Sequence, residues 1–383
     1  MKTEKKINQI INDLKKYKKE DYSFSSGRIL GSMCTTPLPI GRKAYQMFLE
    51  SNLGDPELFL GSKQIENKLF DFYGKLLHAP KKFAGIIGSG GTESNINSIW
   101  IAKTLSKKSK ILVPESAHFS FEKIASLMDI KTQMISLNSD STVDVEDLKE
   151  KIDNKTAAVV GIAGTTELGA VDPIPDMGEI CQDYNVCLHV DAAFGGYVLP
   201  FLKKIGYQVD NFDFQVDGVS SVSIDAHKMG CSAIPLGVLL VKNKEWLSNI
   251  SVASDCVSSE KQIGILGTRS AGPVASAYAI SEYLGFEGYQ DIVENCMKNT
   301  FFIEEKLRAM GLELACGPTM NVIGVKMKKP DEIAKRLSEE GWKVNIMERI
   351  SCLRLVIMPH IGREDLELFA KDFEKICREE DEI

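Results

Sequence analysis

The sequence predicts an α/β fold: a mostly parallel, doubly wound sheet in a large domain, followed by a small α+β C-terminal domain. From about residue 83, short apolar runs alternate with amphipathic segments. This pattern is typical of buried parallel strands joined by helices. After about residue 270 the pattern changes to one long helical stretch, then short strands and two helices. Ligands of doubly wound sheets bind at the carboxyl ends of the strands, so the strand ends are the places to search for function.

The chain begins with a predicted amphipathic helix. Over residues 7–17, apolar residues recur at helical spacing with lysines between them. This pattern favours an arm that packs against the body or against a second subunit, although a basic amphipathic helix can also contact a membrane or another partner. Residues 27–60 are rich in Gly, Pro, Ser and Thr and are predicted to form an irregular link. We expect an N-terminal helical arm and linker over residues 1–55.

The two domains are expected over residues 56–270 and 271–383. The predicted strands of the large domain are FAGIIG, ILVP, TQMIS, TAAVVGI, VCLHVD, VSSVSI and LGVLLVK. The predicted elements of the small domain are a helix through Leu307, strands around NVIGVKM, KVNIM and LRLVIMP, and helices at DEIAKRLSEE and REDLELFAKDFEKI. A chain of 383 residues is long for a single core, so more than one core is expected.

The composition argues against several classes of protein. Asp and Glu total 53 against 46 Lys and Arg, and the formal net charge of −7 offers no broad basic surface for nucleic acid. The nine cysteines are scattered without a metal-ligand or disulfide spacing, so we expect reduced thiols and no metal site. No segment approaches the ~20 apolar residues of a membrane span, and the N-terminus lacks the apolar stretch of a signal peptide. We expect a cytoplasmic protein.

The first strand end of interest is a glycine-rich turn, GIIGSGGTESN. Gly90, Gly91 and Thr92 connect a predicted strand to a predicted helix. Glycines allow close backbone approach, and the free N–H groups at a helix N-terminus attract anions. The segment fits neither the P-loop nor the dinucleotide-binding pattern. A phosphate site and a simple capped turn therefore remain equally open.

Three further strand ends carry single reactive groups. His118 follows ILVP, where it could lie flat against an aromatic ring or cap a helix. Asp191 ends VCLHVD, where a buried carboxylate needs a partner such as a protonated ring nitrogen or an arginine. Lys228 follows VSSVSID, and an amine held at such a place can form a Schiff base with an aldehyde. Each of these residues, taken alone, could also be purely structural.

Together the four strand ends match one ligand. Pyridoxal 5′-phosphate (PLP) has a phosphate, an aromatic ring, a pyridine nitrogen and an aldehyde, and each group has a candidate residue in the sequence. A Schiff-base lysine with an acidic partner for the ring nitrogen is typical of enzymes that use this cofactor. The sequence therefore predicts a PLP enzyme.

The chain resembles the group II PLP-dependent amino-acid decarboxylases in five segments that occur in the family order. They are SGGTESN, SAHFSFEK, GIAGTTELGAVDPI, HVDAAFGG and DAHKMG. Four others, GSMCTTPLPIGRK, NLGDPELFLGSK, ILGTRS and LRLVIMPHI, are similar to the archaeal L-tyrosine/L-aspartate decarboxylases. The resemblance implies fold type I (aspartate aminotransferase-like) and a homodimer with the active site at its interface. It also implies conversion of L-tyrosine to tyramine and/or L-aspartate to β-alanine, for methanofuran or coenzyme A synthesis.

The resemblance also implies roles for individual residues. Lys228 would bind PLP as a Schiff base, Asp191 would contact the ring nitrogen, and His118 would stack on the ring. The other cofactor contacts would be Gly90, Gly91, Thr92 and His227 at the phosphate, and Thr166 and Ala193 at the ring. Arg354, in CLRLVIMP, would hold the substrate carboxylate; the alternative is an ordinary surface arginine.

The sequence departs from the family pattern in one loop. Relatives commonly protonate Cα with a tyrosine on a mobile loop, whereas the corresponding segment SVASDCVSSEKQIG has no tyrosine. Cys256 lies near the expected place, and the alternative proton donors are Lys228 and His118. Other PLP lyase, desulfurase or oxidative deaminase chemistry therefore stays open, as does a PLP carrier without turnover. We expect decarboxylation, because the other site residues are present.

Overall fold

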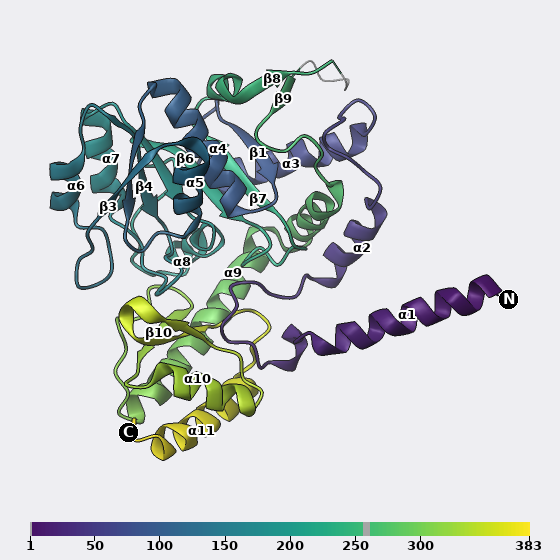
Figure 1. Cartoon of the computed structure of the whole chain (residues 1–383), viewed down its shortest axis with the longest axis vertical. Helices are drawn as coiled ribbons and strands as arrows, with labels where there is room; N and C mark the ends of the chain where they lie inside the picture. Colours follow the sequence, from purple (N-terminus) through teal and green to yellow (C-terminus); the bar gives the residue numbers. More distant parts are fainter. Residues whose placement is uncertain (1, 256–260) are drawn as a thin grey trace.

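The computed structural model describes residues 2–255 and 261–383, and a seven-stranded sheet forms the centre of its larger part (Figure 1). Its strands are β1 (Ala84–Gly88), β2 (Lys110–Pro114), β3 (Lys131–Ile135), β4 (Thr156–Ile162), β5 (Cys187–Asp191), β6 (Val219–Asp225) and β7 (Gly237–Val241). The strand order is β1-β7-β6-β5-β4-β2-β3. Neighbouring strands from β3 to β6 are parallel, and only β7 runs antiparallel to its neighbours β6 and β1. The predicted mostly parallel α/β sheet is confirmed.

Helices cover both faces of this sheet, and the strand residues alternate between two cores. One face packs against α4 (Gly91–Ser106) and α5 (Ser120–Met128). The core on the other face includes residues of α3 (Leu60–Leu76), α6 (Val145–Lys151), α7 (Ile174–Asp183), α8 (Leu199–Lys204) and the first part of α9 (Ala271–Ala309). In β2, Ile111 and Val113 belong to the α4–α5 core, and Leu112 belongs to the other. Successive side chains of a strand point to opposite faces, which explains why a strand covered on both sides, such as β2, is almost continuously apolar.

A second, smaller sheet lies in the C-terminal part. Its antiparallel strands are β10 (Val322–Lys326), β12 (Cys352–Val356) and β11 (Asn345–Met347), in that order. They pack with α10 (Pro330–Glu339), α11 (Arg363–Glu379) and the second part of α9. Helix α9 changes direction at Gly285, whose φ of 57° and ψ of −167° are not helical. Ile280 of α9 belongs to the large core and Leu307 to the small one, so this helix connects the two parts. The domain boundary at residue 270 stays a prediction.

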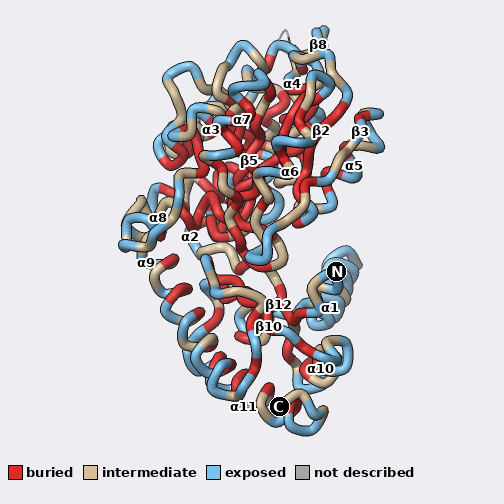
Figure 2. The backbone as a smooth tube through the Cα atoms, turned by 90° about the vertical axis from the view of Figure 1, so that its left-hand side faces the viewer, coloured by how far each residue is buried: buried red, intermediate tan, exposed pale blue. Residues whose placement is uncertain are grey.

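The N-terminal arm differs from two expectations. Helix α1 (Lys2–Glu20) forms as predicted, but its apolar side chains do not pack against the body of the same chain. Ile7, Leu14 and Tyr17 are 54%, 55% and 67% exposed. Figure 1 shows α1 extending away from the rest of the chain, and Figure 2 colours most of its residues as exposed. The link from residue 27 to residue 60 is not irregular throughout, because it contains α2 (Pro39–Met47), which packs against α9. Proline at the first helical position favours a helix start there.

Two short strands, β8 (Ser251–Ala253) and β9 (Lys261–Ile263), pair antiparallel above the large sheet. Within residues 2–255 and 261–383, no helix combines the length and the apolar character needed to cross a membrane.

A buried carboxyl group, Asp172, fixes the segment that follows β4. Its Oδ2 accepts from the Ile162 N–H at 2.7 Å and its Oδ1 from the Val143 N–H at 3.0 Å. Burial raises the pKa of Asp172 to about 7, above its value in an unfolded chain. The folded state therefore binds this proton more tightly than the unfolded state does. The contribution of protonated Asp172 to the free energy of unfolding is complete below about pH 4 and is lost as the pH rises toward about 7.

We expect Asp172→Ala to lower the free energy of unfolding by about 2 to 4 kcal/mol, because two backbone donors lose their acceptor. The loss relative to the wild type should be larger at pH 5 than at pH 7.5. Thermal unfolding midpoints at both pH values test this, with Asp176→Ala, an exposed position in α7, as the matched control. An equal loss at both pH values would show that Asp172 does not titrate as described.

Candidate active site

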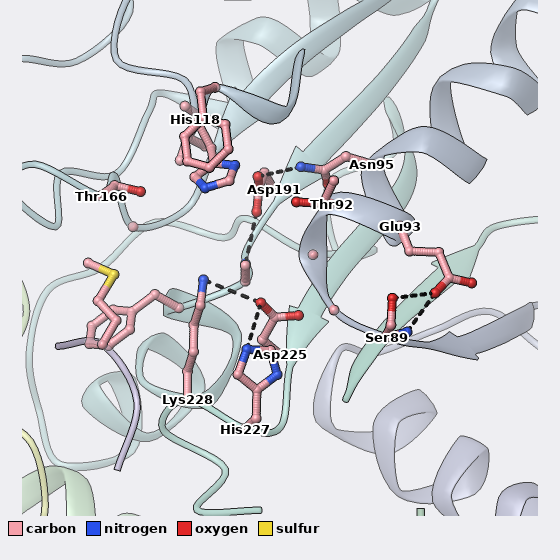
Figure 3. A pocket seen from close by; sticks show the side chains of 18 of the residues that line it. Ser89, Thr92, Glu93, Asn95, His118, Thr166, Asp191, Asp225, His227 and Lys228 are labelled. Atoms are coloured by element: carbon pink, nitrogen blue, oxygen red, sulfur yellow. Dashed lines mark hydrogen bonds and ion pairs between the residues drawn. The ribbon is translucent and has the colours of Figure 1, made fainter. Parts of the chain in front are cut away.

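A cavity of about 320 Å³ lies at the carboxyl ends of the central strands (Figure 3). This volume lies in the range of small-ligand pockets. The predicted site residues that line it are Gly90, Gly91, Thr92, His118, Thr166, Asp191, Ala193, His227 and Lys228. Segments more than a hundred residues apart thus meet at one place, as the doubly wound sheet requires.

The glycine-rich turn presents the N-terminus of α4 to this cavity. The Ser94 N–H donates to the Gly90 oxygen at 3.1 Å as the first bond of the helix, so the preceding N–H groups have no acceptor within the helix. Gly90 has a φ of 139°, which few residues other than glycine adopt, and the His227 ring lies beside it. A Cβ atom on Gly91 would lie 3.1 Å from Asp225 Oδ2. The turn therefore leaves room and donors for an anion.

Lys228 is not an ordinary solvated lysine. Its side chain is 21% exposed, and its Nζ lies 3.3 Å from Oδ2 of Asp225, the last residue of β6. His227 Nε2 lies 3.8 Å from the same oxygen, and Oδ1 of Asp225 is buried without a partner. Burial raises the pKa of Asp225, while Lys228 and His227 act in the opposite direction. The carboxylate thus orients the Lys228 amine in the cavity (Figure 3).

Asp191 is almost completely buried at the end of β5 and receives only neutral donors. Its Oδ2 accepts from Asn95 Nδ2 at 2.8 Å, and its Oδ1 accepts from the Ala193 N–H at 3.1 Å and Ser223 Oγ at 3.3 Å. In the part of the chain that the structure describes, no lysine or arginine forms an ion pair with it. The arginine partner left open by the sequence is therefore not found there. A protonated ring nitrogen would supply the charge that a buried carboxylate needs.

His118 lies between β2 and α5 and points toward Asp191 (Figure 3). Its Nδ1 accepts from the Ser120 N–H at 3.2 Å, so the capping role is present together with the cavity-lining one. Burial lowers the pKa of His118, with Asp191 opposing this effect. The imidazole is therefore neutral at pH 7 and can face an aromatic ring without adding a charge.

Arg354 lies next to the cavity but does not line it. Its guanidinium is 4% exposed and donates to the Thr166 oxygen at 2.7 Å and to the Gly31 oxygen at 2.6 Å. The surface-arginine alternative is wrong. Its Nε is buried without an acceptor, and burial lowers its pKa to about 10. Nε is thus a buried donor of Arg354 without a partner beside the cavity.

Several residues that line the cavity were not predicted from the sequence, and one predicted residue lies outside the part of the chain that the structure describes. The lining residues without a predicted site role are Met33, Ser89, Glu93, Asn95, Ser116, Phe119, Ile162, Gly164, Phe194 and Asp225. Asn95 could have been found, because it follows Thr92 by about one helical turn on a helix that begins at the turn. Met33 comes from the N-terminal segment, whose path depends on long-range contacts. Cys256 lies outside the described residues.

The functional groups around the cavity fit those of PLP. The free N–H groups of α4, the unpaired Asp191 carboxylate, the neutral His118 ring and the Lys228 amine correspond to its phosphate, ring nitrogen, ring face and aldehyde. Asp225 Oδ1 and Arg354 Nε are further buried polar atoms at or beside the cavity without a partner. Such atoms are rare in folded proteins and are explained where a polar ligand satisfies them.

Comparisons with known proteins identify the family. The profile described as "Pyridoxal-dependent decarboxylase conserved domain" matches residues 61–327. The chain is 41% identical to a "Probable L-aspartate decarboxylase" of Archaeoglobus fulgidus, over 96% of this chain and 99% of that protein. It is also 41% identical to a "Probable L-tyrosine/L-aspartate decarboxylase" of Methanothermobacter thermautotrophicus, over 94% of this chain and 100% of that protein.

Among solved structures, the sphingosine-1-phosphate lyase of Burkholderia pseudomallei shares the fold with a TM-score of 0.90. Its sequence identity is 23%, over 97% of this chain and 90% of that chain, so this likeness concerns the fold type I architecture alone. The profile match and the two relatives cover most of the chain. The chain therefore belongs to the pyridoxal-dependent decarboxylase family and is an enzyme that uses PLP as its cofactor.

Proposed function

We propose that the enzyme decarboxylates L-aspartate to β-alanine, with L-tyrosine as a second candidate substrate. The observation that carries the proposal is the meeting of Lys228, Asp191 and His118 in one cavity beside Arg354. Aspartate occurs in the printed names of both relatives described above, and tyrosine in one of them. The pathway that consumes the product and the cytoplasmic location stay predictions.

Each site residue has a separate proposed role in binding the cofactor or the substrate. The N–H groups at the start of α4 hold the phosphate, and His227 lies beside them. Asp191 would hold the proton on the ring nitrogen, and His118 would lie against the ring. When bound, PLP supplies an electron sink for the charge that remains at Cα after CO₂ leaves. Arg354, which Thr166 and Gly31 hold beside the cavity, would bind a carboxylate of the substrate.

Cα must then receive a proton, and two candidate donors lie in the described cavity. Lys228 Nζ carries three protons when it is charged, and Asp225 at 3.3 Å stabilises that charge. Because His118 Nδ1 accepts from Ser120, Nε2 carries the imidazole proton. The structure thus offers donors without a loop tyrosine. The thiol of Cys256 stays a third candidate.

Product analysis tests the proposed reaction. The PLP-loaded protein is incubated separately with aspartate, tyrosine, glutamate, cysteine and cysteate, and CO₂, amine, ammonia and sulfide are measured. Equal amounts of CO₂ and β-alanine are expected from aspartate. Ammonia with an aldehyde in place of the amine would indicate oxidative deamination, and sulfide from cysteine would indicate a desulfurase. A PLP-loaded protein that turns over none of these substrates would match the carrier alternative.

We also propose that the enzyme is a homodimer in which α1 covers the second subunit. The apolar side of α1, formed by Ile7, Ile10, Ile11, Leu14 and Tyr17, is 44–67% exposed. Removing this much apolar surface from water favours association, and the acidic net charge of the chain complements the lysines beside this stripe.

We therefore expect Leu14→Asp to weaken the dimer by at least about tenfold in Kd, because burying an unpaired carboxylate in an interface is unfavourable. Sedimentation equilibrium measures the effect. Asn12→Asp is the control, because it places the same carboxylate on the same helix outside the apolar stripe and leaves the lysines unchanged. A Leu14→Asp protein that dimerises as tightly as the control, or a monomeric wild type, would contradict the arrangement.

A further inference from the structure

A chain of buried polar side chains extends from Asp191 into the core behind the active site. Asn95 Nδ2 lies 2.8 Å from Asp191 Oδ2, and Asn95 Oδ1 lies 3.0 Å from His189 Nε2. His189 Nδ1 lies 2.9 Å from Ser221 Oγ, which lies 2.8 Å from Ser98 Oγ. All five residues are at least nine-tenths buried. The cavity chemistry described above uses only the first link of this chain.

The fold brings these residues to one face of the sheet. Asp191 and His189 are two residues apart on β5, and Ser221 and Ser223 are two residues apart on β6, so each pair points to the same side. Asn95 and Ser98 are three residues apart on α4, which packs on that side. Polar residues thus replace apolar ones in the centre of the sheet, where an unsatisfied group would be unfavourable.

An ionised Asp191 fixes the direction of every hydrogen bond in the chain. Its carboxylate can only accept, so Asn95 Nδ2 donates to it and Asn95 Oδ1 must accept. His189 Nε2 therefore donates to Asn95, and its Nδ1 accepts from Ser221 Oγ. Ser221 Oγ in turn accepts from Ser98. The sequence of donors ends at the carboxylate, so each bond polarises the next toward Asp191.

The chain cannot act as a proton relay. An amide does not exchange its proton at neutral pH, so Asn95 interrupts any transfer between Asp191 and His189. Burial lowers the pKa of His189, an effect that Asp191 opposes only in part, and the imidazole remains neutral. The role left for the chain is to hold the Asp191 side chain in one orientation.

We propose that Asn95 and His189 are positioning residues for decarboxylation: they hold the Asp191 carboxylate in the orientation that directs it at the ring nitrogen of PLP. This inference rests on the role proposed above for Asp191. Ser223 supports the same arrangement, because its Oγ lies 3.1 Å from Asn95 Oδ1 and 3.3 Å from Asp191 Oδ1. Without His189, Asn95 Oδ1 keeps only one of its two donors, Ser223 Oγ, so the amide that donates to Asp191 is held less firmly.

The test compares His189→Leu with His189→Gln, because glutamine can still donate to Asn95 and accept from Ser221. For His189→Leu we expect PLP to bind about tenfold more weakly and kcat to fall about 10- to 100-fold, as for other partners that orient a ligand-binding side chain. KM for aspartate should change less than about threefold, because the substrate contacts are unchanged. His189→Gln should restore PLP affinity and kcat to within about threefold of the wild type.

Thr300→Val is the matched control, because it removes a buried hydroxyl that donates to the Cys296 oxygen far from Asp191. It should lower stability without a change in PLP affinity. His189→Leu with the PLP affinity and kcat of Thr300→Val would overturn the inference. Asp191→Asn is measured in parallel. If it too leaves PLP affinity and kcat intact, the proposed role of Asp191 is wrong; if it alone impairs them, only the role of His189 is wrong.

A measurement on the wild type keeps the inference testable if His189→Leu does not fold. Nitrogen-15 NMR of histidine-labelled protein distinguishes the two neutral tautomers, and the chain contains only five histidines. We expect one buried histidine with its proton on Nε2, in the apoprotein and in the PLP-bound enzyme. A proton on His189 Nδ1, or an imidazolium at pH 7, would reverse the donor order and overturn the inference.

Discussion

Lys228→Ala is expected to abolish decarboxylation and to remove the visible absorbance of the bound cofactor. Lys228 is the lysine whose Nζ is oriented in the cavity by Asp225, at 3.3 Å. Loss of this amine removes the covalent anchor of PLP and one of the candidate proton donors. We expect kcat to fall by on the order of 10³-fold or more. Steady-state assays and absorbance spectra of the PLP-loaded variant measure both effects.

Lys242→Ala provides the control for this variant. Lys242 follows β7, and its amine donates to the Asp217 oxygen away from the cavity. Its replacement should leave both kcat and the absorbance band unchanged. A Lys228→Ala protein that retains the band would mean that another amine holds the cofactor.

Asp191→Ala is expected to have the second largest effect. The donors around the carboxylate at the end of β5 are all neutral, and in the proposed mechanism this carboxylate keeps the ring nitrogen protonated. Without it the ring withdraws electrons less strongly from Cα. We expect kcat to fall about 10²- to 10³-fold, comparable with the loss of one preorganised electrostatic group in other enzymes. PLP should also bind more weakly, which titration of the apoprotein measures.

Two further variants test whether the carboxylate charge of Asp191, at this position, is what matters. Asp191→Glu keeps the carboxylate and should retain more activity than Asp191→Ala. Asp213→Ala removes another buried carboxylate, one that pairs with His78 outside the cavity, and should affect stability without changing PLP affinity. Equal kcat values for Asp191→Ala and the wild type would show that the ring nitrogen has no need of this residue.

The strands and the principal site residues could be predicted from the sequence, because their signals are local. Each strand of the large sheet is a short apolar run, and each strand end carries a distinct group such as Asp191 or Lys228. Strand ends of a doubly wound sheet converge on one edge, so the meeting of these groups follows from the fold class. The glycine-rich turn was ambiguous alone and became informative only beside them.

The parts that escaped prediction depend on contacts between distant segments. Met33 reaches the cavity from the N-terminal segment, and Arg354 is fixed by the carbonyl groups of Gly31 and Thr166. No local sequence pattern predicts such contacts between distant segments. His189 looked like one more residue of an apolar strand, although its spacing of two from Asp191 places both on one face. The exposure of α1 depends on what covers it, which periodicity does not indicate.

Covalent mapping of the cofactor tests the central claim most directly. The PLP-loaded enzyme is treated with borohydride, which fixes the cofactor to the amine that holds it, and the protein is digested and examined by mass spectrometry. The account predicts a single phosphopyridoxyl group on the peptide that contains Lys228, and none after reduction of the Lys228→Ala variant. A modification on any other lysine of the wild type, with Lys228 unmodified, would contradict the account.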